Sequence, residues 1–215
     1  MEIDVRLTAD GRVVVIHDGD LRRTGRMRLA VARATWRELC EADVGRWKHA
    51  RWAGERVPLL AEVLATVPRG ATLFVEAKIG GEIAPALRSV VDEHAPTGVA
   101  LVFMSFVPET VAAMARVLPD HQVCLLRTAR QWRARGGLSA AVSLARASGA
   151  AALDFETHPR LDSQVTGAIH AAGLRLYVWT VNRISTARRL AAAGVDGITT
   201  DRCAWMHERL ARLKG

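Results

Sequence analysis

Residues 2–18 read EIDVRLTADGRVVVIHD, and the interpretation of the whole chain depends on this stretch. Side chains of a β-strand alternate between its two faces, so Glu2 and Asp4 point the same way. Two neighbouring carboxylates repel each other unless a cation, a basic group or water compensates their charge. Hard oxygen ligands of this kind suit Mg²⁺ or Ca²⁺. The pair is a candidate metal site, although a solvated strand face is the simpler explanation of an isolated E-x-D pattern.

A turn and a second strand follow the acidic pair. Asp10 and Gly11 supply the local hydrogen bonding and the positive φ that a short hairpin connection needs. The β-branched run over residues 12–16 therefore returns antiparallel to the first strand and ends at His17 and Asp18. An imidazole close to two carboxylates suits metal-assisted acid–base chemistry. A single histidine at a strand end is more often structural, so both interpretations stay open on these residues alone.

The length and composition indicate one globular domain spanning residues 1–215. Half of the residues are hydrophobic, yet no apolar run reaches the length of a membrane span, so no transmembrane helix is expected. Three cysteines, Cys40, Cys124 and Cys203, are widely spaced and odd in number. This pattern fits reduced thiols in the cytoplasm better than a disulfide framework or a metal site.

The formal net charge is +8, from 30 basic and 22 acidic residues, and it favours anionic partners. Much of the excess is arginine scattered over the predicted helices. No recognisable nucleic-acid motif or aromatic stacking platform accompanies the charge, so nucleic-acid binding is not expected. The same electrostatic field attracts small phosphodiesters. The sequence leaves the oligomeric state open.

Strands and helices alternate from residue 72 onward, as in an α/β protein with a parallel sheet. The predicted strands span residues 72–78, 99–106, 122–127, 151–155, 174–182 and 198–201. The predicted helices span residues 35–42, 58–67, 83–94, 108–117, 129–148, 162–172, 185–193 and 204–213. Residues 43–57 are rich in Trp, Arg and Gly without clean periodicity, and we expect an irregular loop over the mouth of a barrel.

The strand count indicates an incomplete barrel. The return strand of the hairpin cannot run parallel to its predecessor across so short a turn, so we expect an excursion rather than a member of the sheet. The strand at residue 2 and the six downstream strands make seven, one short of a (β/α)₈ TIM barrel. Within residues 72–78, strand alternation places Glu76 and Lys78 on one face, which adds a third acid and a lysine.

Several motifs recur in a known order along the chain. The hairpin is followed by DLRRTGR (residues 20–26), VEAK (75–78), MSF (104–106), AGLRLYVWTVN (172–182) and GVDGITTDR (194–202). In order and spacing these segments resemble the glycerophosphodiester phosphodiesterase family, whose early region reads like ELDV-x-x-T-x-DG-x-x-VV-x-HD. The resemblance covers almost the whole chain and is more specific than any single motif.

The resemblance implies a fold, an activity and a set of site residues. The family folds as a (β/α)₈ barrel and uses a divalent cation, Mg²⁺ or Ca²⁺, to hydrolyse glycerophosphodiesters to glycerol 3-phosphate and an alcohol. On the matching positions, Glu2, Asp4 and Glu76 are the metal-binding acids. His17 matches a catalytic histidine, and Lys78 matches a catalytic lysine near the substrate phosphate. Trp179 matches a residue of the glycerol pocket, with core packing as an equal alternative.

One family feature is missing from the sequence. The family begins with an H-R-G strand and a helix, and no histidine of this chain sits in an H-R-G context. The chain is therefore expected to lack the first βα unit, and with it a second catalytic histidine and an arginine that faces the phosphate. Two alternatives to the diesterase stay open: a catalytically impaired barrel that binds anionic ligands or a partner, and a related phospholipase of the same barrel type.

Overall fold

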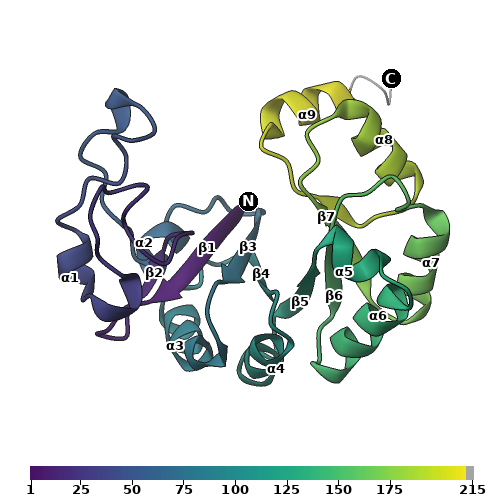
Figure 1. Ribbon diagram of the computed structural model, residues 1–215, viewed down its shortest axis with the longest axis horizontal. Coiled ribbons are helices and arrows are strands. Elements are labelled where there is room, and N and C mark those ends of the chain that lie inside the picture. The colour runs from purple at the N-terminus through teal and green to yellow at the C-terminus, as the bar shows by residue number, and fades with distance from the viewer. Residues whose placement is uncertain (212–215) are drawn as a thin grey trace. The chain divides into compact units, whose positions relative to one another are not determined.

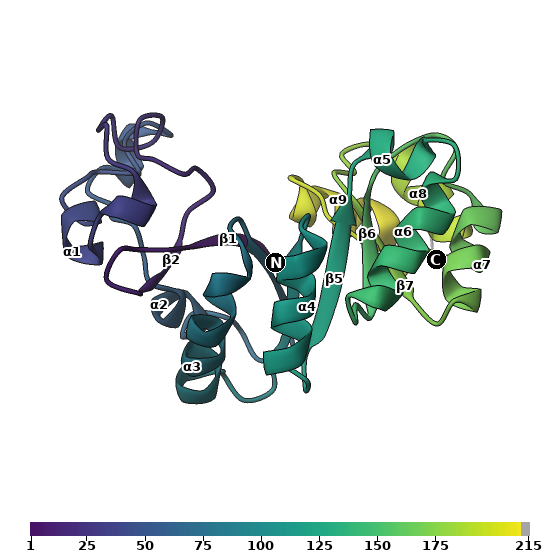
Figure 2. The same cartoon turned by 60° about the horizontal axis from the view of Figure 1, so that its bottom comes forward.

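The computed structural model describes residues 1–211 and forms two compact units (Figure 1, Figure 2). The first unit contains residues 1–104 and 116–121, and the second contains residues 105–115 and those from 122 onward. Strands alternate with helices in both units, which confirms the predicted α/β class. None of the helices within the described residues combines the length and apolar composition of a membrane span. The single-domain organisation of residues 1–215 stays a prediction.

The first unit is built on the strand order β2-β1-β3-β4. These strands are β1 (Glu2–Leu7), β2 (Val13–Val15), β3 (Thr72–Ala77) and β4 (Ala100–Ser105). β1 pairs antiparallel with β2 and parallel with β3, and β3 pairs parallel with β4. The helices are α1 (Trp36–Leu39), α2 (Leu60–Leu64) and α3 (Ala84–His94), with 3-10 helices at Val31–Arg33, Ala50–Trp52 and Gly81–Ile83.

The predicted hairpin is confirmed, and its turn forms for the expected reasons. Val5 pairs with Val15, and Gly11 has a φ of 74°. The Thr8 hydroxyl donates to Asp10 Oδ1 at 2.6 Å, which fixes the turn between them. The prediction that the return strand lies outside the sheet is wrong, because β2 forms its antiparallel edge beside β1. An antiparallel strand can pair with the free edge of a parallel sheet without any crossover connection.

A hydrophobic cluster holds the segment after the hairpin against β2. Val14, Leu21, Val31 and Leu39 are all buried in it. Helix α1 starts at the predicted capping box, since Thr35 Oγ1 accepts from Glu38 N and the Glu38 carboxylate accepts from Thr35 N. Residues 16–44 thus share one hydrophobic core with Val14 of β2 and with Val57.

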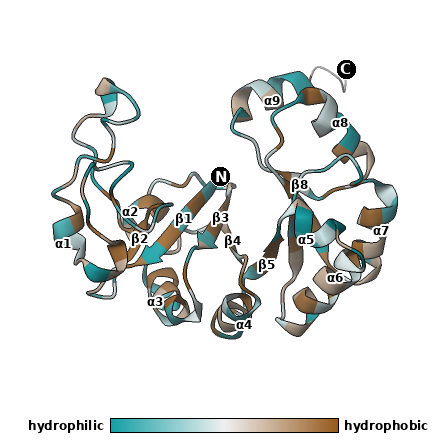
Figure 3. Ribbon diagram, in the orientation of Figure 1, coloured by the Kyte–Doolittle hydropathy of each residue, from teal (hydrophilic) through white to brown (hydrophobic). Residues whose placement is uncertain are grey.

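The second unit is built on the parallel strand order β5-β6-β7-β8. The strands are β5 (Gln122–Arg127), β6 (Ala152–Glu156), β7 (Arg175–Trp179) and β8 (Gly197–Ile198). The helices are α5 (Ala129–Arg133), α6 (Gly137–Ala147), α7 (Ser163–Ala171), α8 (Ile184–Ala192) and α9 (Cys203–Ala211), and α4 (Pro108–Val117) begins in this unit. The strands are rich in apolar residues, as their burial in a parallel sheet requires. In Figure 3 β5 is therefore largely brown, whereas α5 is largely teal.

Three predicted elements differ from the structure. Residues 129–148 form two helices, because Gly136 has a φ of 71° and a Cβ on Gly137 would lie 2.3 Å from the Gln131 carbonyl oxygen. The strand predicted over residues 174–182 ends at Trp179, and the strand predicted over residues 198–201 keeps only Gly197–Ile198.

Beyond the shortened strands, a further backbone bond, from Val181 N to Thr199 O at 2.8 Å, is followed by side-chain hydrogen bonds. Asn182 Oδ1 accepts from the Thr200 hydroxyl and from the Asp201 backbone N–H, both at 3.0 Å. These bonds hold the two chain segments together beyond the last backbone pairs. The remaining predicted helices and strands are present with ends shifted by one to a few residues, and residues 212–213 of the last predicted helix lie outside the described residues.

Candidate active site

Glu2, Asp4 and Glu76 are brought together by the parallel pairing of β1 with β3. Asp4 lies opposite Glu76 in the register, and Glu2 lies opposite Phe74. Residues opposite each other in a sheet project to the same face, so the acids of both strands share one face. Val75 projects to the other face and is 1% exposed. The strand alternation seen in the sequence thus places all three carboxylates together.

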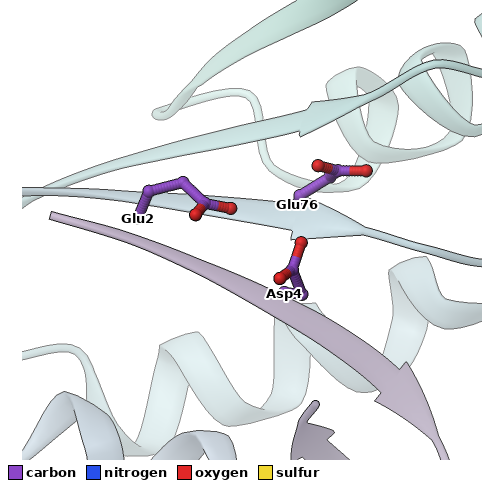
Figure 4. Close-up of side chains that lie close together, drawn as sticks. All are labelled: Glu2, Asp4 and Glu76. Atoms are coloured by element: carbon purple, nitrogen blue, oxygen red, sulfur yellow. The ribbon is translucent and has the colours of Figure 1, made fainter. Parts of the chain in front are cut away.

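The three carboxylates converge at this face, as Figure 4 shows. One oxygen from each lies within 4.8 Å of the other two. Mg²⁺ and Ca²⁺ hold oxygen ligands at about 2.0–2.6 Å, so two oxygens bound to one ion lie up to roughly 5 Å apart. The cluster therefore fits a hard divalent cation in spacing and in donor chemistry.

Lys78 follows β3 and pairs with two of the three acids. Its Nζ lies 2.6 Å from Glu76 Oε1 and 3.1 Å from Asp4 Oδ1. Burial lowers the pKa of Lys78, but the hydrogen bond and charge of Glu76 and the charge of Asp4 outweigh it, so the pKa is raised overall. The ammonium is therefore charged at neutral pH, and it compensates part of the acidic cluster when no cation is bound.

Burial and mutual repulsion make two of the acids reluctant to ionise. Glu2 is exposed as a whole residue, but desolvation of its carboxylate, followed by the charges of Asp4 and Glu76, raises its pKa from the ordinary value of 4.5 to about 7. Burial also raises the pKa of Glu76, against the lowering effect of Lys78. A bound cation removes this repulsion, so cation and proton compete for the same oxygens.

This competition predicts the pH dependence of the ion-free protein. The folded state keeps the Glu2 proton up to about pH 7, whereas the unfolded chain loses it near pH 4.5, so the folded state binds more protons in this window. The free energy of unfolding in chelator is therefore expected to fall as the pH rises from about 5 to about 7.5. Urea unfolding measures it, with Glu2→Gln expected to reduce the fall and the exposed control Glu41→Gln expected to preserve it. An unchanged fall in Glu2→Gln contradicts the assignment.

His17 ends the hairpin and is oriented by an acid–base chain. Its Nδ1 lies 2.8 Å from Asp18 Oδ1, and Arg23 Nε donates to Asp18 Oδ2 at 2.6 Å. The hydrogen bonds from Arg23 and His17 lower the pKa of Asp18 to about 2, so its carboxylate is ionised at neutral pH. With Nδ1 engaged by Asp18, the ring is arranged to use Nε2 in proton transfer.

Arg6 holds the two chain segments that carry His17 and Lys78. Its Nε donates to the His17 carbonyl at 3.0 Å, and its Nη1 lies 3.5 Å from the Lys78 carbonyl. Arg6 follows Glu2 and Asp4 at the same two-residue spacing, so it belongs to the same face of β1. It acts as a positioning residue for both side chains.

Sequence reasoning assigned no role to Arg6, Asp18 or Arg23. The spacing of Glu2, Asp4 and Arg6 could have identified Arg6, because all three alternate onto one strand face. Asp18 could have been identified as well, because it directly follows His17 in the sequence and a carboxylate there can orient the ring. No sequence signal identifies Arg23, because its contact with Asp18 depends on the path of the loop between them.

Trp179 lies at the end of β7 in the second unit. Its ring meets Phe106 edge to face, with centroids 5.8 Å apart. The side chain is half-buried, and its Nε1 is buried without a hydrogen-bond partner among the described residues. A buried donor of this kind is suited to a ligand oxygen. The role of Trp179 in a glycerol pocket stays a prediction, with core packing as the alternative.

Comparisons with known proteins agree with this architecture. The glycerophosphoryl diester phosphodiesterase family model matches residues 1–204. The Bacillus subtilis (strain 168) protein YhdW, whose name places it provisionally among the glycerophosphodiester phosphodiesterases, is 31% identical over 204 residues, which span 94% of this chain and 82% of the relative. A glycerophosphodiester phosphodiesterase of Caldanaerobacter subterraneus is 28% identical over 210 residues, which span 94% of this chain and 81% of that protein.

A solved structure gives the same result. The Oleispira antarctica phosphodiesterase in complex with the product sn-glycerol-3-phosphate matches with a TM-score of 0.86 and 26% identity, covering 98% of this chain and 84% of that chain. The family match and the named relatives place this α/β fold of the TIM-barrel type among the phosphoric diester hydrolases. This chain belongs to the glycerophosphoryl diester phosphodiesterase family. Both the predicted family and the predicted fold class are confirmed.

Proposed function

We propose that this chain hydrolyses glycerophosphodiesters to glycerol 3-phosphate and an alcohol with the help of a divalent cation ligated by Glu2, Asp4 and Glu76. The convergence of the three carboxylates within 4.8 Å is the observation that supports the proposal most strongly. When bound, Mg²⁺ or Ca²⁺ neutralises charge on the phosphate oxygens and polarises the phosphorus centre. The family match supports the substrate class, a small molecule with a glycerophosphate part.

Lys78 adds a second positive charge to the same site. In the ion-free protein its ammonium lies between Glu76 and Asp4. With these acids engaged in holding a cation, the Lys78 ammonium would be released from them and would be available to a phosphate oxygen. Positive groups already in place stabilise the charge of the transition state without reorganisation. We assign Lys78 to catalysis and to binding of the phosphate.

His17 is assigned the proton transfer. Hydrolysis adds a water oxygen to phosphorus and breaks the bond to one alcohol oxygen, which must receive a proton. The Nε2 of His17 gives this proton or takes one from the attacking oxygen, while Asp18 and Arg23 keep the ring in place. The charge of His17 lowers the pKa of Glu2 and Glu76, although burial raises both more strongly.

Trp179 is assigned to the glycerol part of the substrate. Its ring offers an apolar wall, and its buried Nε1 offers a donor. We also propose that the protein works in the cytoplasm, because Cys40, Cys124 and Cys203 are free thiols.

A direct test of the proposal measures cation binding. Isothermal titration of the chelator-treated protein with Mg²⁺ or Ca²⁺ is expected to show one site, and Asp4→Asn is expected to weaken its affinity by about 10- to 100-fold. The control variant Asp92→Asn, on the exposed surface of α3, is expected to bind as the wild type does. Failure of the folded wild type to bind either cation contradicts the proposal.

A further inference from the structure

Residues 43–57 form a loop whose one regular element among the described residues is the 3-10 helix Ala50–Trp52, and we call it the tryptophan loop. Its base is closed by a hydrogen bond from Val44 N to Glu55 O at 2.8 Å. Asp43 Oδ1 accepts from the backbone of Gly45 and Arg46 at 3.0 and 2.9 Å. A Cβ on Gly45 would lie 1.9 Å from the Trp52 carbonyl oxygen, so only glycine permits this close approach. Backbone and capping bonds therefore shape the loop.

Two tryptophans of this loop are held out of the core. Trp47 is 41% exposed and Trp52 is 43% exposed, and both are absent from the hydrophobic cluster beneath the loop. All residues from 46 to 56 are exposed. In both views the segment around residue 50 projects away from α1 and α2 (Figure 1, Figure 2). Large aromatic side chains kept outward on an ordered projection indicate a surface that contacts something else.

Basic side chains surround both rings. The guanidinium of Arg23 lies 4.7 Å from the centroid of Trp47, with Lys48 Nζ at 5.8 Å, and Arg51 lies 4.7 Å from the centroid of Trp52. The two acids of the loop, Asp43 and Glu55, stand at its base. Within the described part of the chain, no ion pair engages Lys48 or Arg51. The tip of the loop is therefore both aromatic and positively charged.

We propose that the tryptophan loop docks this protein on the surface of an anionic phospholipid bilayer. Tryptophan rings favour the headgroup level of a bilayer, where an apolar body and a polar N–H are both accommodated. Lysine and arginine near the surface add attraction to anionic lipids. No recognisable nucleic-acid motif accompanies the loop, and Lys48 and Arg51 flank aromatic rings of the kind that favour the bilayer interface. The charge and exposure of the tip thus favour a bilayer.

The docking surface lies next to the catalytic machinery within the first unit. Arg23 contacts Trp47 with its guanidinium face and donates to Asp18, which orients His17. Arg23 alone therefore separates a bilayer bound at Trp47 from Asp18 and His17. Binding itself requires no activity, so the docking proposal can fail or hold independently of the proposed function.

The test is cosedimentation of the full chain with vesicles, either of phosphatidylcholine alone or of phosphatidylcholine mixed with phosphatidylglycerol. The wild type is expected to bind the anionic vesicles at least about tenfold more strongly, and added salt is expected to weaken binding. Lys48→Gln with Arg51→Gln is expected to reduce binding about 10- to 30-fold. Trp47→Ala with Trp52→Ala is expected to reduce it about tenfold.

A matched control separates location from total charge. Arg130→Gln with Arg135→Gln removes the same charge from exposed positions of the second unit and is expected to leave binding within about twofold. Urea unfolding checks that each variant is folded, and the charge variant decides the outcome if the tryptophan variant is not. Absence of binding by the wild type, equal loss in the control, or equally tight binding to duplex DNA at the same salt overturns the proposal.

Discussion

Glu76→Gln is expected to lower kcat/KM for glycerophosphodiesters by about 10³-fold. Glu76 is 7% exposed, lies opposite Asp4 in the sheet and pairs with Lys78 at 2.6 Å, so its carboxylate cannot be replaced by water or by a nearby side chain. The amide keeps the size and shape of the side chain but removes the negative charge that holds a cation. The loss should therefore appear in cation affinity as well as in rate.

Stability measurements separate this effect from misfolding. The pKa of Glu76 is raised by burial, so the fold disfavours the charged form of this side chain. The neutral amide is therefore expected to leave the ion-free protein at least as stable as the wild type in urea. Stabilisation by added Mg²⁺ or Ca²⁺ is expected to disappear. Glu93→Gln, on the exposed surface of α3, is the control and should change neither property. Wild-type hydrolysis by folded Glu76→Gln contradicts the role of this residue.

His17→Asn is expected to lower kcat by about 10²- to 10⁴-fold while cation binding is retained. The asparagine amide can still meet Asp18, which lies 2.8 Å from the ring nitrogen in the wild type, so the loop should stay in place. It cannot transfer a proton near neutral pH. The loss should fall on kcat rather than on KM, because His17 is needed for proton transfer and not for holding the phosphate.

The matched control for His17 is His94→Asn, at the exposed end of α3. It removes one imidazole from the same unit and is expected to leave kcat unchanged. The pH profile offers a second readout, since the limb that depends on the histidine should disappear in His17→Asn. A variant that retains both the rate and the pH profile of the wild type shows that another group transfers the proton.

The hairpin shows what local rules could predict. Alternation in β1 placed Glu2 and Asp4 on one face, and the Asp10-Gly11 turn returned His17 to the same end of the sheet. These inferences depend on a two-residue period and on turn chemistry, both of which are written in the local sequence. The meeting of Glu76 with Asp4 also needed β1 and β3 to be neighbours in the register that sets these residues opposite each other, which the sequence alone did not determine.

Other features depend on contacts that local patterns do not encode. The split after Arg133 is an exception, because the pair Gly136-Gly137 is a local turn signal that could have predicted it. Arg23 and Asp18 lie in one loop, and the path of this loop is set by the packing of a hydrophobic cluster. No periodic sequence pattern encodes that path. Beyond the end of β8, the Val181 N–H still donates to the Thr199 carbonyl, and the side-chain bonds of Asn182 follow. In these last two cases tertiary contacts decide the outcome.

The measurement that tests the central claim most directly is release of glycerol 3-phosphate from glycerophosphocholine by this 215-residue chain, with Mg²⁺ or Ca²⁺ and then with excess chelator. We expect steady release with a cation, loss of release in chelator, and recovery when the cation is restored. Release that persists unchanged in chelator, from protein shown to be free of metal, would contradict a cation held by Glu2, Asp4 and Glu76. Failure of the folded, cation-loaded chain to release any product would contradict the proposed activity itself.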